Sequence, residues 1–529
     1  MESGADGPNR THVRFLSIWP LFVLLALLSL AACTDSDGSE DDAEVRLLFV
    51  ADDGLGEDAF DYRSDFVAGA THAGLTGRAA DGRVIPALAS SWRVLKDGRS
   101  YVFKMREASW PDGREITSGD VVAVLRRLVA PGSDSPLKPW LMDIEGAVAV
   151  AANRAPTRML GVDDPLPDIV TIELSQPDPT LLAKLALPAA GVVRTRDDVP
   201  PPSGAYAVEA RGDAALQLLP NPSWFGADQD KRRLAIAIGA SLDPAAAVAA
   251  YDRGEVDIVM GGTTNGLDAA QAEPLTAALK LEPTYGLYGY LMRADRGPLA
   301  DVRVRRALAM AVDREALLRD ELVVPGMQAA YGPLPPTLPP RFAGAVPDWS
   351  VWNSDARQAE ARRLLTEAGY GPGNPLSLDV AIPQGSIHEA ILGQVAEDLA
   401  PLGVRLRAYR RSPQQHRQTV ADGDYDLALS ERIRPVPEPR DFLAPFSCAV
   451  RAAASCDPDA DDLLQQADLA EDAGTRTEMI RRAARLLSED ALILPLFSPV
   501  RWSLVRPGIT GWESNISGGH PPRFWRRGG

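Results

Sequence analysis

Three cysteine thiols are the side chains of this chain best suited to covalent chemistry. The first, Cys33, follows an apolar run over residues 15–32 that ends in Leu-Ala-Ala, and Arg10 and Arg14 precede that run. A basic start, an apolar centre and small residues before a cleavage point are typical of a secretory signal. Residues 1–32 are therefore predicted to be a signal peptide that directs the chain out of the cytoplasm.

The end of this signal resembles the lipobox of bacterial lipoproteins. The resemblance implies that the thiol of Cys33 is diacylated and that Cys33 becomes the first residue of the mature protein. Two acyl chains hold a protein firmly on a membrane, whereas one binds only marginally. The alternative is a membrane-spanning helix, although the run is near the lower length limit for spanning. We expect a lipid anchor on the extracytoplasmic face, at the cell surface or in the periplasm.

The segment that follows Cys33 has the composition of a tether. Residues 34–44 contain six acidic side chains and one apolar side chain, Ala43. Such a segment cannot bury a core and is expected to be solvated. Residues 33–44 are thus predicted to be a lipidated cysteine with an acidic spacer.

The other two cysteines, Cys448 and Cys456, are eight residues apart. Outside the cytoplasm a pair this close favours a disulfide, which would contribute roughly 2–3 kcal/mol by the chain-entropy estimate. Metal binding by two thiolates is the alternative, but no histidine is nearby in the sequence.

Charge and motifs argue against several classes of protein. The chain has 529 residues and a formal net charge of -17, and nucleic-acid binding needs a basic face. It contains no nucleophile elbow, no phosphate-binding loop and no His-Glu-x-x-His motif. The histidines after the signal, His72, His388, His416 and His520, lack metal-ligand spacing. We expect no catalytic residue, no cofactor and no metal site.

The elements that must position any site alternate between strands and helices, which indicates an α/β fold. The chain of 529 residues is longer than one hydrophobic core usually serves, so two or more domains are expected. Ser118 is the predicted N-cap of a helix over residues 120–129, and residues 285–292 form an aromatic strand. Other strands are predicted at 45–51, 101–105, 169–174, 256–260, 376–382, 404–409, 426–429, 492–496 and 502–505. Other helices are predicted at 243–253, 302–312, 355–368 and 387–402, with two more in 461–487.

Several sequence blocks in this order resemble the family-5 bacterial extracellular solute-binding proteins, which bind oligopeptides, dipeptides or nickel complexes for ABC importers. The resemblance runs from about Pro86 to Gly511. The blocks that carry it are Pro86–Trp92 with Lys96–Gly98, Phe103–Glu107, Trp110–Gly113, Thr117–Val122, Ser203–Tyr206, Asn221–Trp224, Gly254–Ile258, Asp301–Leu308 with Asp313–Glu315, Gly332–Pro335, Ala361–Gly369 and Asp424–Asp426.

The resemblance implies a two-lobe, periplasmic-binding-protein-like fold with two crossing hinge strands. Residues 45–285 and 498–529 would form lobe I, and residues 286–497 would form lobe II. The crossings are expected near 285–291 and 494–500. The lobes would close on a solute by a hinge motion that the solute stabilises through contacts to both of them. Some members of the family also have a disulfide in the stretch that contains Cys448 and Cys456.

The ligand site departs from the family at one position. Peptide-binding members hold the α-amino group of the peptide with an aspartate, and here that position is Pro435. Arg432 and Arg434 lie nearby, and Arg293 stands where asparagine is common. Guanidinium groups suit carboxylates and phosphates, so one interpretation is a ligand bound through an anionic group. The alternative is that these arginines pair with Glu431, Glu438 or Asp441. A one-residue shift of the match would restore part of the ligand-binding role to Glu431.

Three further ligand contacts are predicted from position. Tyr288 and Tyr290 are two apart on a strand, so both point to one face, and this face could meet the cleft. Gln384 follows a strand end in lobe II and could line the cleft as well.

The function that follows is capture of a peptide-like solute for an ABC importer, with the permease, the solute and the membrane as partners. We expect a monomer that does not bind nucleic acid. The alternative is an envelope lipoprotein of the same fold that acts through protein contacts, as a sensor or an assembly factor. A tethered hydrolase is a third and weaker possibility.

Overall fold

The computed structural model describes residues 44–51, 55, 62–95, 98–194, 200–211, 215–228, 233–272, 275–448, 456–470 and 472–528. Predictions for the signal, for Cys33 and for residues 34–43 lie outside these ranges. None of the helices in the described ranges is long and apolar enough to cross a bilayer.

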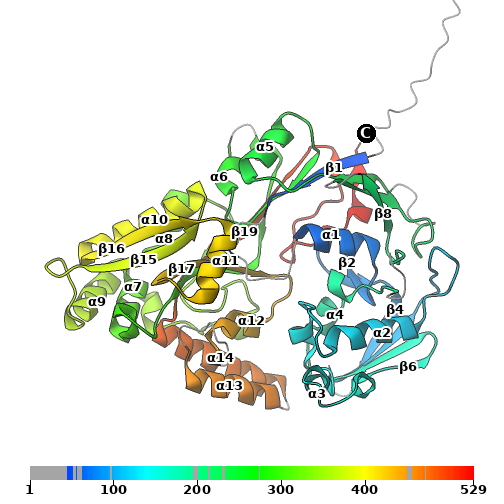
Figure 1. The fold of residues 1–529 in the computed structure, drawn as a ribbon, viewed down its shortest axis with the longest axis horizontal. Helices are drawn as coiled ribbons and strands as arrows, with labels where there is room; N and C mark the ends of the chain where they lie inside the picture. Colours follow the sequence, from blue (N-terminus) through cyan, green and yellow to red (C-terminus); the bar gives the residue numbers. More distant parts are fainter. Residues whose placement is uncertain are drawn as a thin grey trace, which may run out of the picture. The chain divides into compact units, whose positions relative to one another are not determined.

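A seven-stranded sheet forms the centre of the part of the chain that we call lobe I (Figure 1). Its order is β12-β19-β11-β1-β10-β9-β8, and β1 runs parallel to both neighbours. These strands are β1 (Glu44–Phe49), β8 (Tyr206–Arg211), β9 (Ala215–Pro220), β10 (Ala235–Ile238), β11 (Ile258–Met260), β12 (Leu279–Pro283) and β19 (Val500–Val505).

A second sheet in lobe I has four antiparallel strands in the order β4-β5-β7-β6. Helix α2 (Ser118–Val129) packs on it through a shared apolar core. The helix begins at Ser118 and its N-cap is Thr117, one residue before the predicted cap, because Thr117 and Asp120 form a capping box. The strands are β4 (Ala89–Leu95), β5 (Ser100–Met105), β6 (Val162–Leu166) and β7 (Ile169–Glu173), and beside them β2 (Thr76–Arg78) pairs with β3 (Val84–Pro86).

A six-stranded sheet forms the centre of lobe II, in the order β14-β18-β13-β17-β15-β16. Two separate apolar clusters cover its faces. One includes residues of α7 (Val302–Ala311), α9 (Ser354–Glu367) and α10 (Ser386–Leu399), and the other includes residues of α12 (Pro439–Leu443), α13 (Pro458–Leu469) and α14 (Ala473–Asp490) (Figure 1). Both faces are buried, and the central strands β13 and β18 are accordingly largely apolar, whereas β17 also carries Ser430, Glu431, Arg432 and Arg434. The strands are β13 (Tyr285–Met292), β14 (Gln328–Ala329), β15 (Leu376–Pro383), β16 (Val404–Arg411), β17 (Leu427–Arg434) and β18 (Ile493–Ser498).

Every helix predicted above is present, and the structure adds helices that the sequence pattern did not predict, the longest of them at Tyr62–Thr71 and Pro413–Asp422. Beside α2, the described helices are α1 (Tyr62–Thr71), α3 (Ala147–Ala151), α4 (Leu181–Lys184), α5 (Pro244–Asp252), α6 (Leu267–Ala270), α7 (Val302–Ala311), α8 (Arg314–Ala316), α9 (Ser354–Glu367), α10 (Ser386–Leu399), α11 (Pro413–Asp422), α12 (Pro439–Leu443), α13 (Pro458–Leu469) and α14 (Ala473–Asp490). A short pair, β20 (Ile509–Thr510) and β21 (Arg526–Arg527), lies near the C-terminus.

The chain passes between the two large sheets at two points. Thr284 separates β12 from β13, and Pro499 separates β18 from β19. The two points are joined, because Thr284 Oγ1 donates to the carbonyl of Pro499 at 2.6 Å and Ser498 Oγ donates to the carbonyl of Thr284 at 3.3 Å. The predicted α/β fold with two lobes and two crossing strands is confirmed.

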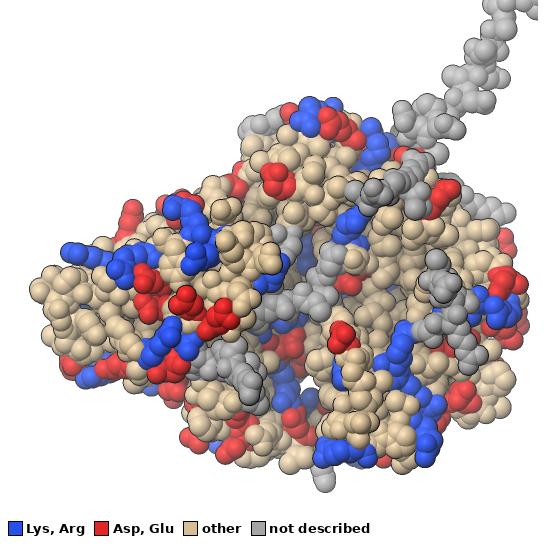
Figure 2. Space-filling view, viewed as in Figure 1, with Lys and Arg blue, Asp and Glu red and all other residues tan. Residues whose placement is uncertain are grey.

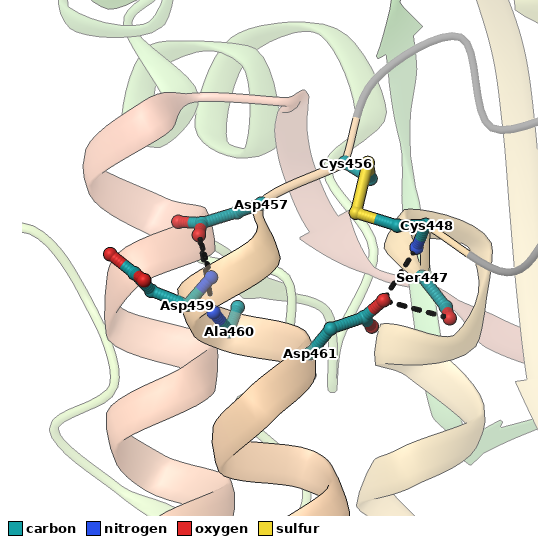
Figure 3. The surroundings of a disulfide bond; sticks show 7 residues. All are labelled: Ser447, Cys448, Cys456, Asp457, Asp459, Ala460 and Asp461. Atoms are coloured by element: carbon teal, nitrogen blue, oxygen red, sulfur yellow. Dashed lines mark hydrogen bonds between the residues drawn. A yellow bond between two sulfur atoms is a disulfide. The ribbon is translucent and has the colours of Figure 1, made fainter.

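Cys448 and Cys456 form a disulfide, with their Cα atoms 5.0 Å apart (Figure 3). The carboxylate of Asp461 on α13 accepts from the backbone N–H of Cys448 at 2.7 Å, and Asp457 caps the start of that helix. The two thiols are therefore bonded to each other and not to a metal. Within the described ranges, no group of three or more His, Cys, Asp or Glu side chains is arranged to hold a metal ion.

Candidate ligand-binding cavity

A cavity of about 1020 Å³ lies between the two lobes. This is at the upper end of the roughly 300–1,000 Å³ that ligand pockets occupy. Most described residues that line it belong to lobe I, and they include positions in α1, β2 and the C-terminal segment after β19. Lobe II contributes Arg417, Glu431, Ile433 and Pro435 to the described lining. A solute in this cavity can touch both lobes.

Strand β17 shows which of its residues face the cavity. Glu431, Ile433 and Pro435 line the cavity and are spaced by two, as expected for one face of a strand. Arg432 and Arg434 alternate with them and point to the opposite face.

The two arginines that were predicted to bind a ligand are engaged on that opposite face. Arg432 Nη1 donates to the backbone carbonyl of Asp441 at 2.7 Å, and Arg434 forms an ion pair with the Asp441 carboxylate. Neither arginine is among the described residues that line the cavity. Arg434 is thus paired with a nearby carboxylate, as in the alternative, whereas the contact of Arg432 is to a backbone carbonyl.

Glu431 is the predicted ligand contact that the structure places at the cavity. Its side chain is buried, and it reaches across to lobe I. Its carboxylate accepts from Thr264 Oγ1 at 2.6 Å, from Thr264 N at 3.2 Å and from Thr263 Oγ1. Glu431 therefore ties the lobes together at the wall of the cavity.

Tyr288 and Tyr290 share a face of β13, as predicted, but that face is covered. Both side chains are fully buried. The ring of Tyr288 stacks on Phe497 with centroids 4.6 Å apart, and its hydroxyl lies 2.9 Å from Nδ1 of His388 on α10. The structure places both tyrosines in the core of lobe II, because α10 packs over this part of the sheet.

Arg293 and Gln384 are placed elsewhere on lobe II. Arg293 pairs with Asp295 at 2.7 Å and donates to the carbonyl of Gly423 at 2.5 Å. Gln384 is exposed at the end of β15. Neither is among the described lining residues.

The described wall of the cavity carries more positive than negative side chains. It has two carboxylates, those of Asp65 and Glu431. Its arginines are Arg63, Arg78, Arg106, Arg417, Arg501 and Arg523. The excess of four arginines over carboxylates contrasts with the acidic composition of the whole chain, whose acidic and basic side chains are interspersed on the face shown in Figure 2.

Burial also controls the ionisation of two groups in the wall. It lowers the pKa of His72 to about 4, so this imidazole is neutral at pH 7. It lowers the pKa of Arg78 to about 10, and the nearby Tyr285 opposes this shift. Sequence reasoning did not single out His72, Arg78 or Arg501 as cavity residues, because the segments that bring them together are more than 400 residues apart.

A second set of polar contacts joins the lobes outside the cavity. Lys184 of lobe I is buried and pairs with Asp178 of its own lobe at 2.9 Å and with Glu438 of lobe II at 3.1 Å. Burial acts to lower the pKa of Lys184, but Glu438 and Asp178 outweigh it and raise the pKa above its ordinary value. Asp143 of lobe I pairs with Arg476 of lobe II at 2.9 Å.

The comparisons with known proteins agree with this architecture. The family model described as "Bacterial extracellular solute-binding proteins, family 5 Middle" matches residues 83–453. The periplasmic murein peptide-binding protein MppA of Escherichia coli (strain K12) is 27% identical over 464 residues, which cover 84% of each chain. The periplasmic oligopeptide-binding protein OppA of the same strain is 26% identical over 457 residues, which cover 82% of each chain.

Solved structures show the same fold. The crystal structure of Haemophilus influenzae OppA in complex with RPPGFSPFR matches with a TM-score of 0.76 at 20% sequence identity. The match covers 92% of this chain and 99% of that chain. The chain therefore belongs to the bacterial extracellular solute-binding proteins of family 5, a family of binding proteins and not of enzymes.

Proposed function

We propose that this protein is the lipid-anchored, extracytoplasmic capture subunit of an ABC importer and that it encloses a peptide-like solute by closure of its two lobes. The cavity between the lobes is the observation that carries this proposal. Diacylation of Cys33 would hold the body at the membrane through the acidic tether of residues 34–43, since Glu44 already belongs to β1, and a permease would receive the solute.

The contacts between the lobes support a closing mechanism. Glu431 with Thr264, Lys184 with Glu438, and Asp143 with Arg476 each join one lobe to the other. Such contacts exist only while the lobes are together. A solute that touches both lobes adds to them and shifts the population toward the closed form.

The proposal that the solute is peptide-like is based on the proteins to which this chain is similar. MppA and OppA are named as murein peptide-binding and oligopeptide-binding proteins, and the Haemophilus influenzae structure is a peptide complex. In this chain the position of the amine-binding aspartate is Pro435, which lines the cavity. Glu431 is the one carboxylate that lobe II contributes to the described lining, so we propose Glu431 as the group that faces the amino end of a peptide.

Native mass spectrometry of the full chain, expressed with its N-terminal segment and purified in detergent, tests the capture function. We expect one small peptide-like molecule per protein, which denaturation releases. A protein that retains no small molecule but retains a stoichiometric protein partner would contradict the importer role and support the sensor or assembly-factor role.

The anchor is tested separately with Cys33→Ser. We expect the wild-type protein in the membrane fraction with an acylated N-terminus. The variant should lack the lipid mass and remain unprocessed. An unmodified Cys33 in wild-type protein would refute lipidation without affecting the proposed solute binding.

A further inference from the structure

Two arginines in the wall of the cavity pack side by side on one segment of backbone. Gly518 and Gly519 lie in the C-terminal segment and line the cavity. A Cβ atom at Gly518 would collide with the guanidinium of Arg501, and one at Gly519 would lie 3.3 Å from Cδ of Arg78. The missing side chains of the two glycines thus make room for Arg501 and Arg78.

These arginines have no carboxylate partner in the described part of the chain. Arg78 donates only to backbone carbonyls, those of Gly82 at 3.0 Å and of Pro435 at 3.1 Å. Nη1 of Arg501 is buried and has no hydrogen-bond partner among the described residues. Glu282, the cross-strand neighbour of Arg501, instead binds His520 at 2.9 Å.

Arg106, a third arginine in the cavity wall, also has a buried nitrogen without a hydrogen-bond partner among the described residues. Arg106 lies over the ring of Phe225, with Cζ 4.4 Å from the centroid, and its buried Nε has no described hydrogen-bond partner. Burial lowers the pKa of Arg106. All three arginines are half-buried. A buried guanidinium nitrogen without a hydrogen-bond partner is unfavourable, and an anion that enters the cavity relieves this cost.

From this arrangement we infer that the captured solute carries an anionic group, a carboxylate or a phosphate, in addition to the C-terminal carboxylate that every peptide has, and that Arg78 and Arg501 bind this group from lobe I. The inference rests on the proposed function and narrows its solute class to acidic peptides or similar anions. Arg78 also reaches the carbonyl of Pro435 in lobe II. An anion bound at Arg78 therefore lies where the lobes meet and favours closure.

The test compares three peptide libraries on the full chain in detergent. The libraries contain random tri- to pentapeptides that are identical except for one position, which is Glu, Gln or Lys. The Lys library tests for the opposite charge preference, in which the cavity favours a cationic side chain. Separate arms use glutarate and inorganic phosphate, and native mass spectrometry measures the occupancy.

We expect the Glu library to bind roughly 5- to 12-fold better than the Gln library, since the Gln side chain can still accept a hydrogen bond from an arginine but lacks the carboxylate charge. Arg501→Gln should remove most of this preference, and Arg501→Lys should retain part of it. The matched control is Arg253→Gln, because Arg253 is exposed and pairs with Glu255. A folded Arg78→Gln variant serves as a second test if Arg501→Gln does not fold.

The outcomes separate this inference from the proposed function. Equal binding of the Glu and Gln libraries, or tighter binding of the Lys library, overturns the inference and leaves peptide capture intact. Binding of glutarate or phosphate alone, with loss in Arg501→Gln, supports the anion site and overturns the peptide class. Failure of every library and both anions to bind overturns the inference as well.

Discussion

Replacing Glu438 with glutamine should open the protein without unfolding it. Glu438 is the lobe II partner of Lys184, whose side chain is 2% exposed, and Asp178 remains beside Lys184 within lobe I. When the lobes separate, Lys184 keeps Asp178 and loses Glu438. The substitution therefore weakens the closed form and leaves the interactions of the open form in place.

The size of the effect follows from the type of contact that is lost. A hydrogen bond to a charged group contributes about 1.5–3 kcal/mol, and one between neutral groups about 0.5–1.5 kcal/mol. Glutamine can still accept a hydrogen bond from the Lys184 ammonium but lacks the carboxylate charge, so the closed form loses about 1–1.5 kcal/mol relative to the open form, a part of the full value of the contact. The ratio of closed to open molecules should fall by roughly 5- to 12-fold, and the solute should bind more weakly by the same factor.

Pulsed EPR between spin labels on Val208 of lobe I and Val351 of lobe II, both exposed, measures the two populations. The matched control is Glu389→Gln, because Glu389 pairs with Arg410 within lobe II. Asp178→Asn should lower the unfolding temperature more than it changes the populations. An identical closed fraction in Glu438→Gln and Glu389→Gln would refute the role of this ion pair in closure.

Three further results are expected. The pKa of His72 is lowered to about 4 from 6.5, so the unfolded state binds more protons between these values. The unfolding free energy should then fall by up to about 3 kcal/mol as the pH drops from 6.5 to 4. Denaturant melts should show this component in the wild type and not in His72→Gln; equal pH profiles would contradict it. Replacing Cys448 and Cys456 together with serine should cost about 2–3 kcal/mol of stability, and an unchanged thermal midpoint would refute this. Thr117→Ala should cost about 1 kcal/mol by removing the cap of α2, measured by the same melts, whereas a neutral effect would show that the capping box contributes little.

The sequence predicted most of the secondary structure because each element is locally consistent. The aromatic strand at 285–292 matches β13, and the helices at 302–312 and 355–368 match α7 and α9 within one residue at each end. Their periodicity and caps depend on neighbours in the sequence. The N-cap of α2 was misplaced by one residue because Thr117 and Ser118 are both good caps, and only the capping box with Asp120 distinguishes them.

The candidate site was harder to predict. Strand periodicity was sufficient to separate Glu431 from Arg432 and Arg434, since neighbours on a strand point to opposite faces. What it could not show was which face of β17 meets the cavity. The same limit applies to Tyr288, whose face is covered by α10 in the folded protein.

The sequence alone determined the α/β class, the family resemblance and the pairing of two close cysteines, because these depend on local pattern and short separations. Only the tertiary structure determined which arginine side chains lie next to each other in the wall of the cavity. Arg78 and Arg501 come from opposite ends of the chain and lie together only because Gly518 and Gly519 leave space beside them. No local pattern records such a contact, since it arises from the packing of segments that are distant in the sequence.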